Sequence, residues 1–239
     1  ASVENRLEAE IQELTDYDPH QLNCLLHPEK CPSVFRLGDC ECSDPEHCRV
    51  NCLFEALYRD EQGDLQIDPE RCVGCGDCID RCKARKLTDS KDILPALEAI
   101  HRAQRPVYAM IAPSFVNQYS GRVTPGKLRS AFKRLGFTGM VEVALFADIL
   151  TLKEALEFDK NIQTQADFQL TSCCCPMWIA MIRKVYHQLI PHLPGAVSPM
   201  VACGRAIKQL HPGAITVFIG PCIAKKAEAR EPDVADSTD

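Results

Sequence analysis

The chain has 239 residues, of which 46% are hydrophobic and 25% are charged, and its formal net charge is −6. This composition is typical of a globular protein with one large or two small domains, and it excludes a broad basic face for nucleic acid or an anionic membrane. The longest apolar stretches, near residues 107–113 and 214–220, are shorter than the roughly 20 residues of a membrane-spanning helix. The acidic N-terminus does not resemble a signal peptide, so we expect a soluble, cytoplasmic protein.

Three regions follow one another along the chain. Residues 1–22 are expected to form a short amphipathic helix, because Leu7, Ile11 and Leu14 recur at helical spacing. Residues 23–90 are rich in Cys, Pro, Gly and Asp, as in small domains that metal clusters hold together. Residues 91–239 alternate short apolar runs with amphipathic stretches, which predicts an α/β domain with a largely parallel sheet. The predicted strands are 107–111, 140–145, 168–171 and 215–219, and the predicted helices are 125–135, 147–163, 178–193 and 200–211.

Fifteen cysteines lie in two blocks, ten between Cys24 and Cys82 and five between Cys173 and Cys222. A small secreted domain with this many cysteines would contain disulfides. Because this chain lacks a signal peptide and carries CxxC spacing, we interpret its cysteines as metal ligands instead.

The clearest motif is a C-x2-C-x2-C-x3-C run inside RCVGCGDCIDRC. Three thiolates at this spacing can surround one 4Fe–4S cube while the fourth reaches a neighbouring cluster, and zinc would need two separated pairs. Gly74 and Gly76 give the loop the backbone freedom that such a turn needs. The run consists of Cys72, Cys75, Cys78 and Cys82.

The upstream companion run has irregular spacing in its first half. We expect one cluster on Cys52, Cys72, Cys75 and Cys78. We expect the second on Cys40, Cys42, Cys48 and Cys82. Two of the four cysteines at 24, 31, 40 and 42 are left over, either as spare thiols or as ligands of something further. Residues 23–90 are therefore predicted to be an α+β, ferredoxin-like module with two 4Fe–4S clusters, in which His27 and His47 are surface residues.

The second cysteine block lies at two places where a predicted strand gives way to a helix. The segments are TSCCCPMW at residues 171–178 and GPCIAKK at residues 220–226. Open α/β sheets bind ligands at the carboxyl ends of their strands, where helix N-termini attract anions.

These two segments resemble the signatures TSCCPxW and PCxxKxxE of iron-only (FeFe) hydrogenases, and the resemblance spans about residues 24–228. It implies an active-site 4Fe–4S cube with a di-iron subcluster, for which Cys175 and Cys222 would be ligands. Cys174 would be the proton donor, and Lys225 would bind a cyanide ligand through a charge-assisted hydrogen bond. The family resemblance also implies a pocket lined by Ala112, Pro113 and Ser114, and a proton path through Glu154 and Glu157.

The chain departs from the family pattern at several positions. It has three adjacent cysteines instead of two, so counting from Thr171 rather than from Pro176 would make Cys173 the donor and Cys174 the ligand. Gly220 replaces a usual Met, and Pro194 replaces a relay serine. The third signature, ExxxxCxxGC, does not occur in the sequence, so we expect the chain to be truncated. Cys203 is no evident substitute for the missing bridging cysteine.

Three functions remain open from sequence. The first is a hydrogenase that receives electrons from ferredoxin or another redox protein and is loaded by hydrogenase maturation factors. The second is a hydrogen or redox sensor of low turnover, which Gly220 and Pro194 favour. The third is an iron–sulfur assembly or scaffold protein without a di-iron site.

Overall fold

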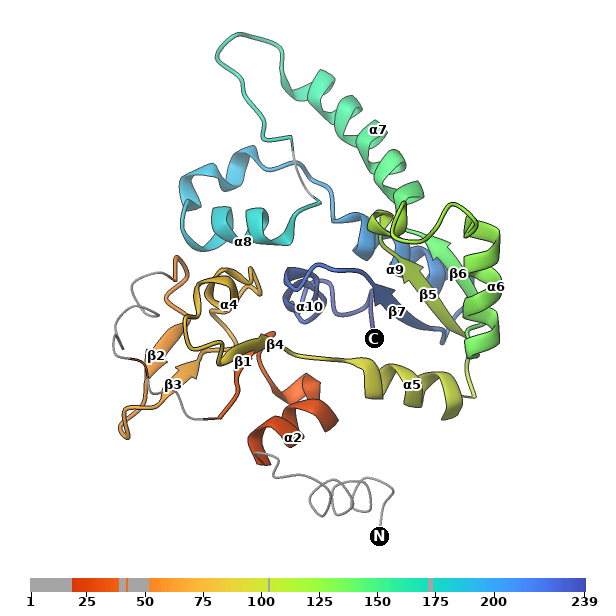
Figure 1. Ribbon diagram of the computed structural model, residues 1–239. Helices are drawn as coiled ribbons and strands as arrows, with labels where there is room; N and C mark the ends of the chain where they lie inside the picture. Colours follow the sequence, from red (N-terminus) through yellow and green to blue (C-terminus); the bar gives the residue numbers. More distant parts are fainter. Residues whose placement is uncertain (1–18, 39–41, 43–51, 103, 172–173) are drawn as a thin grey trace. The chain divides into compact units, whose positions relative to one another are not determined.

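The computed structural model describes residues 19–38, 42, 52–102, 104–171 and 174–239 (Figure 1). These residues belong to two compact units divided between Leu97 and Glu98. The predicted amphipathic helix falls mostly outside these residues. The first described helix, α2, spans Pro19–Leu26.

The first unit is built from short antiparallel strand pairs. Its strands β1 (Val34–Arg36) and β4 (Leu87–Asp89) pair with each other, as do β2 (Leu57–Arg59) and β3 (Leu65–Ile67). Each strand has three residues and buries only one or two apolar side chains. A 3-10 turn, η1 (Pro28–Lys30), precedes β1, and the short helix α4 (Asp77–Arg81) precedes β4. A unit with so little regular structure needs additional stabilisation, such as metal or disulfides.

The second unit has a three-stranded parallel sheet in the order β6-β5-β7. The predicted strands at 107–111 (β5) and 215–219 (β7) are confirmed, and β6 covers Gly139–Glu142. The predicted strand at 140–145 is wrong at its end, because the chain turns into helix from Ala144. The predicted strand at 168–171 is wrong: the segment is irregular, and Leu170 N donates to His192 O at 2.8 Å outside any strand ladder of the described residues.

Helices cover both faces of this sheet. Helix α6 (Pro125–Leu135) and the end of α5 (Ile93–Arg102) pack on the face that contains Ala109, whereas α9 (Pro199–Leu210) and the start of α7 (Ala144–Asn161) pack on the face that contains Met110. Helix α6 matches its predicted bounds because Thr124 accepts a hydrogen bond from Lys127 N and Gly136 ends the helix at φ 107°.

The predicted helix at 178–193 is interrupted. Helix α8 spans Pro176–Lys184, and a separate 3-10 helix, η3, spans His187–His192. Pro191 lies inside η3, where it prevents a regular α-helix because proline removes one hydrogen bond and clashes with the preceding turn. Two short elements complete the unit: η2 (Pro113–Phe115) after β5 and α10 (Ala224–Ala229) after β7.

Among the helices of the described ranges, none is both long and apolar enough to cross a membrane.

Candidate functional site

Four cysteines of the first unit lie close enough to influence one another's ionisation. Burial raises the pKa of the Cys78 thiol to about 12, and the charges of Cys72, Cys75 and Cys52 add to this increase. Burial likewise raises the pKa of Cys72, and Cys75 and Cys52 contribute again. Such thiols become thiolates together only when a cation compensates their charge. Within the described residues, no three of these or other His, Cys, Asp or Glu side chains are arranged to hold a single metal ion. Cys52, Cys72, Cys75 and Cys78 are the four residues that the sequence assigns to one cluster.

The loop that carries three of these thiols depends on glycine. Gly74 and Gly76 have φ values of 65° and 82°, a left-handed conformation that strains other residues. Gly76 is also the N-cap of α4, which begins at Asp77 and contains Cys78. Cys75, between the two glycines, is exposed.

Cys52 and Cys82 begin two copies of one backbone turn. In each copy the third residue after the cysteine has a positive φ (51° and 52°) and donates to the cysteine carbonyl at 3.0 Å. The next N–H donates to the cysteine sulfur, at 3.4 and 3.2 Å, and the following residue begins a strand. Sequence analysis missed this repeat, although the C-x4-L spacing in both copies signals it. The residues concerned are Glu55, Ala56 and Leu57, and Arg85, Lys86 and Leu87.

The ligands predicted for the second cluster are described only in part. Cys42 and Cys82 are half-buried, whereas Cys40 and Cys48 lie outside the described residues. His47 lies outside them as well.

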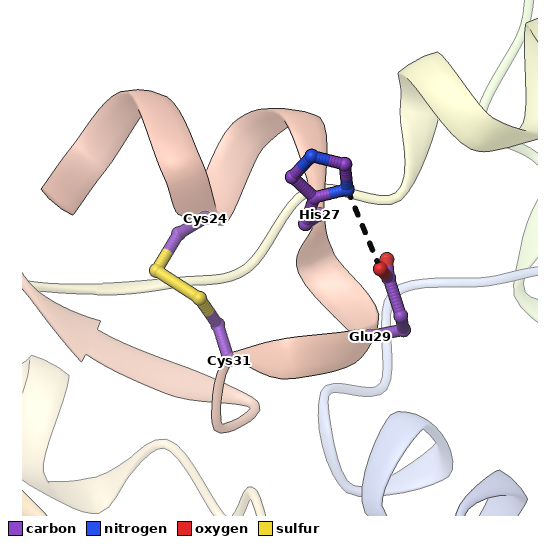
Figure 2. The surroundings of a disulfide bond; sticks show 4 residues. All are labelled: Cys24, His27, Glu29 and Cys31. Atoms are coloured by element: carbon purple, nitrogen blue, oxygen red, sulfur yellow. Dashed lines mark ion pairs between the residues drawn. A yellow bond between two sulfur atoms is a disulfide. The ribbon is translucent and has the colours of Figure 1, made fainter. Parts of the chain in front are cut away.

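Cys24 and Cys31 form a disulfide, which corrects the expectation that no cysteine would pair with another (Figure 2). The end of α2 and the η1 turn bring their Cα atoms to 5.6 Å, a separation that a disulfide can span. Both cysteines are buried beside Phe35. His27 lies in the turn between α2 and η1, and its Nδ1 is 3.5 Å from Glu29 Oε1.

In the second unit, the loops after β5 and β7 touch at the carboxyl edge of the sheet. Ala112 N donates to Ile219 O at 2.9 Å. A Cβ atom on Gly220 would lie 2.8 Å from the Ala112 Cβ, so glycine is required for this close approach. The predicted pocket residues at 112–114 and the segment that carries Cys222 are therefore neighbours, and Gly220 has a packing role.

The first-signature cysteines lie at the beginning of α8. Cys175 is the half-buried N-cap of this helix, Pro176 is its first residue, and Cys174 is exposed. Ser172 and Cys173 lie outside the described residues, so the two possible alignments of the three cysteines stay open. Helix α8 packs against α10, which follows Cys222, so the two signature helices are in contact.

Lys225 has a partner within the second signature. Its ammonium lies 2.7 Å from Glu228 Oε2, and the two side chains are only 11% and 14% exposed. A buried ammonium needs a negative partner, and this one has a carboxylate one turn further along α10. Sequence analysis quoted the glutamate of the PCxxKxxE pattern but gave it no role.

Glu154 and Glu157 occupy different environments although they lie one turn apart on α7. Glu157 accepts a hydrogen bond from Gly195 N at 2.9 Å, and Lys153 donates to Gly195 O at the same distance. Glu154 has a buried oxygen, Oε1, with no partner among the described residues. The buried indole N–H of Trp178, on α8, likewise has no hydrogen-bond partner among the described residues. Glu157 therefore holds the backbone beside Pro194, while Glu154 retains an available acceptor.

Cys203 belongs to the core and is fully buried between α9 and the sheet. Burial raises the pKa of its thiol to about 12. It therefore behaves as a small apolar side chain.

Residues 105–239, more than half of the chain, match the family model "iron only hydrogenase large subunit, C-terminal domain". The chain belongs to the iron-only hydrogenase family. Residues 65–85 of this family member also match a 4Fe–4S binding domain.

The relatives of this hydrogenase-family chain include both enzymes and assembly proteins. It is 28% identical over 299 aligned residues to iron hydrogenase 1 of Clostridium pasteurianum, covering 98% of this chain and 50% of the relative. It is 28% identical to cytosolic iron-sulfur assembly component 3 of Pongo abelii, covering 68% of this chain and 39% of the relative. An apo FeFe-hydrogenase HydA1 structure from Chlamydomonas reinhardtii matches with a TM-score of 0.45 at 26% identity, covering 59% of this chain and 40% of that one. The chain thus spans about half the length of these relatives, or less.

Proposed function

We propose that this chain carries the electron-supplying module and the first part of the active site of an FeFe hydrogenase, which interconverts hydrogen with protons and electrons. The observation that carries the proposal is the meeting of the two signature segments. Gly220 packs on Ala112, α8 packs on α10, and Lys225 is buried beside Glu228. A site of this kind needs a metal group, a nearby base and an exit for protons.

The residues present fit the chemistry of the expected group. Cys175 and Cys222 would hold the active-site cube, Cys174 would exchange the proton, and Lys225 would bind an anionic ligand of the metal. The cofactor, when bound, supplies the site at which hydrogen is split or formed. Ala112, Pro113 and Ser114 would line the pocket. Glu154, with its available buried oxygen, would pass protons onward.

Electrons would reach this site through the first unit. The clustered thiols of residues 52, 72, 75 and 78 would hold one 4Fe–4S cluster, and Cys40, Cys42, Cys48 and Cys82 the second. The repeated turn at Cys52 and Cys82 supports two clusters, because each backbone N–H is aimed at a ligand sulfur. The expected electron partner is ferredoxin or another redox protein, and maturation factors would load the di-iron group.

A second candidate function is iron–sulfur cluster assembly without a di-iron site. The similarity to cytosolic iron-sulfur assembly component 3, over 68% of this chain, favours it. In that case the N-terminal clusters and the cube on Cys175 and Cys222 would be present, while Lys225 would keep Glu228 as its only charged partner.

Infrared spectroscopy of anaerobically matured protein distinguishes the two functions. Metal-bound carbonyl and cyanide bands, with hydrogen evolution measured in parallel, are the expected result for the hydrogenase. Iron–sulfur absorption without such bands, despite competent maturation, would identify an assembly protein.

A further inference from the structure

One histidine holds the segment that leads into the first signature. His192 is the last residue of η3, and its ring stacks on Phe168 with the ring centroids 3.8 Å apart and the planes inclined by 20°. Its Nδ1 lies 3.0 Å from Phe168 O, and its own carbonyl oxygen accepts a hydrogen bond from Leu170 N at 2.8 Å. Three different contacts therefore join His192 to residues 168–170.

The Nδ1 contact defines what the imidazole does. A carbonyl oxygen can only accept a hydrogen bond, so Nδ1 carries a proton and donates it to Phe168 O. The Phe168 side chain is 50% exposed, so burial holds it only in part, and the stack with His192 adds a specific contact. The imidazole thus binds both the backbone and the side chain of this residue.

The contacts of His192 close a loop that contains the first signature. The hydrogen bond from Leu170 N to His192 O joins the two ends of residues 170–192. This closed loop includes Cys174, Cys175 and the whole of α8, against which η3 packs. The chain therefore enters and leaves the cysteine-bearing segment at one point, and that point is His192.

The chain beyond His192 is anchored to α7. Gly195 lies three residues further along, where its N–H donates to Glu157 and its carbonyl oxygen accepts from Lys153 Nζ, both at 2.9 Å. Pro194, just before it, is buried. Helix α7 packs on α9, and α9 packs on the sheet. His192 thus connects the closed loop to the body of the second unit.

We propose that His192 is a positioning residue for Cys175, the expected ligand of the active-site cube. Its imidazole fixes the backbone at Phe168 and Leu170, and the closed loop then keeps α8, with Cys175 at its N-cap, in place against α10. The inference rests on the cube of the proposed function, which the hydrogenase and the assembly protein would share, and it does not depend on a di-iron group.

Electron paramagnetic resonance of the cube tests the proposal in protein reconstituted with iron and sulfide alone. The cube is identified as the signal of the reduced protein that Cys175→Ala lacks. His192→Leu keeps an apolar side chain of similar size but has no donor. In this variant we expect altered g-values of the cube signal, and iron loss from the cube to an anaerobic chelator that is about tenfold faster. The signals of the N-terminal clusters should not change.

Two further variants serve as matched controls. The amide of asparagine can donate from nearly the position of Nδ1, so His192→Asn should restore the g-values of the wild type and most of its resistance to the chelator. His211 also stacks on an aromatic ring, that of Tyr108, with the centroids 5.0 Å apart and the planes inclined by 22°. Because it lies outside the closed loop, His211→Leu should leave both measurements unchanged.

The possible failures are distinguishable. A cube that is lost in Cys175→Ala but unchanged in His192→Leu would overturn this inference and leave the proposed cube standing. Spectra that are unchanged in Cys175→Ala would overturn the proposed cube and this inference with it. Equal effects of His192→Asn and His192→Leu would show that the Nδ1 hydrogen bond does not act, and an equal effect of His211→Leu would show a general loss of stability; either result would overturn the positioning role.

Discussion

At the scale of single residues, the cysteine side chains of this protein have very different surroundings. Cys72 and Cys78 share a set of interacting thiols, Cys24 and Cys31 are joined to each other, and Cys203 is surrounded by apolar core. Their chemistry follows from these neighbours and not from the residue type. Thiols that neighbour other thiols can share a metal, whereas an isolated buried thiol remains protonated and acts as packing.

We expect Cys72→Ala to remove one of the two 4Fe–4S clusters of the first unit. The remaining three thiols cannot complete the cube, so iron and visible absorbance assigned to this unit should fall by about half. Cys203→Ser is the matched control, because this thiol lies in the core of the second unit, and it should leave the iron content unchanged. Iron analysis and absorption after anaerobic reconstitution measure both. Equal iron loss in the two variants would contradict the assignment.

The Lys225–Glu228 pair should be strongly coupled. Removing either charge leaves the other buried without a partner, so Glu228→Gln and Lys225→Met should each lower the free energy of unfolding by about 1–3 kcal/mol. The double variant should lose less than the sum, which denaturant unfolding of cluster-free protein can measure in a double-mutant cycle. Additive losses would show that the two side chains do not interact.

At the scale of elements, close backbone approaches position the site more than helix propensity does. Gly220 allows β7 to end against Ala112, and Gly204 allows the last residues of the chain to cross α9. This last segment is anchored by Arg205, which binds Asp236, and by Thr216, which donates from its hydroxyl to Ser237 O at 2.9 Å. The polar sequence after Glu231 is thus a packed loop, and Ser237 within it is fully buried.

Gly204→Ala should detach this loop from α9. The added Cβ would lie 1.8 Å from Ser237 O, a backbone atom that cannot move without breaking the bond to Thr216. We expect a loss of about 1–3 kcal/mol in the free energy of unfolding and faster amide exchange at residues 234–239.

The control for this variant is Gly126→Ala in α6. The nearest atom to the new Cβ is Thr124 Oγ1 at 3.9 Å, so the substitution should be neutral or stabilising by up to about 1 kcal/mol. Equal effects of the two substitutions would indicate a general intolerance of the helices and not the predicted clash.

At the scale of the whole molecule, the two units are stabilised in different ways. The second unit has apolar cores on both faces of its parallel sheet, including Met110 on one face and Ala109 on the other. The first unit has three-residue strands, a small apolar cluster around the Cys24–Cys31 disulfide, and neighbouring thiols, among which burial raises the pKa of Cys78. Metal should therefore contribute a large share of the stability of the first unit and little to that of the second.

Removal of iron by an anaerobic chelator should change the amide exchange rates of the two units to different extents. Amides of β2, β3 and β4 should exchange much faster, while those of β5 and β7 should keep their protection. Hydrogen-exchange mass spectrometry of loaded and iron-depleted protein measures this difference. Similar acceleration in both units would mean that they fold as one cooperative body and would contradict the prediction.

Local patterns were sufficient for part of this architecture. Strands β5 and β7 are short apolar runs bounded by Pro or Gly, and α6 has both a Thr cap and a terminal Gly, so their bounds follow from nearby residues alone. The segment at 168–171 carries Phe168 and Leu170, but the strands that the structure describes do not pair with it. Pairing is a long-range property, and for this reason the prediction failed there.

The sequence by itself determined the family, the cluster motif at Cys72–Cys82 and the two signature segments, because metal ligation requires particular residue types at particular spacings. Only the tertiary structure decided that Cys24 pairs with Cys31, that Gly220 rests on Ala112, that Glu228 neutralises Lys225 and that Glu157 holds Gly195. Each of these depends on how backbone segments approach one another, and the free energy of that approach comes from the packing of the whole unit and not from any local pattern.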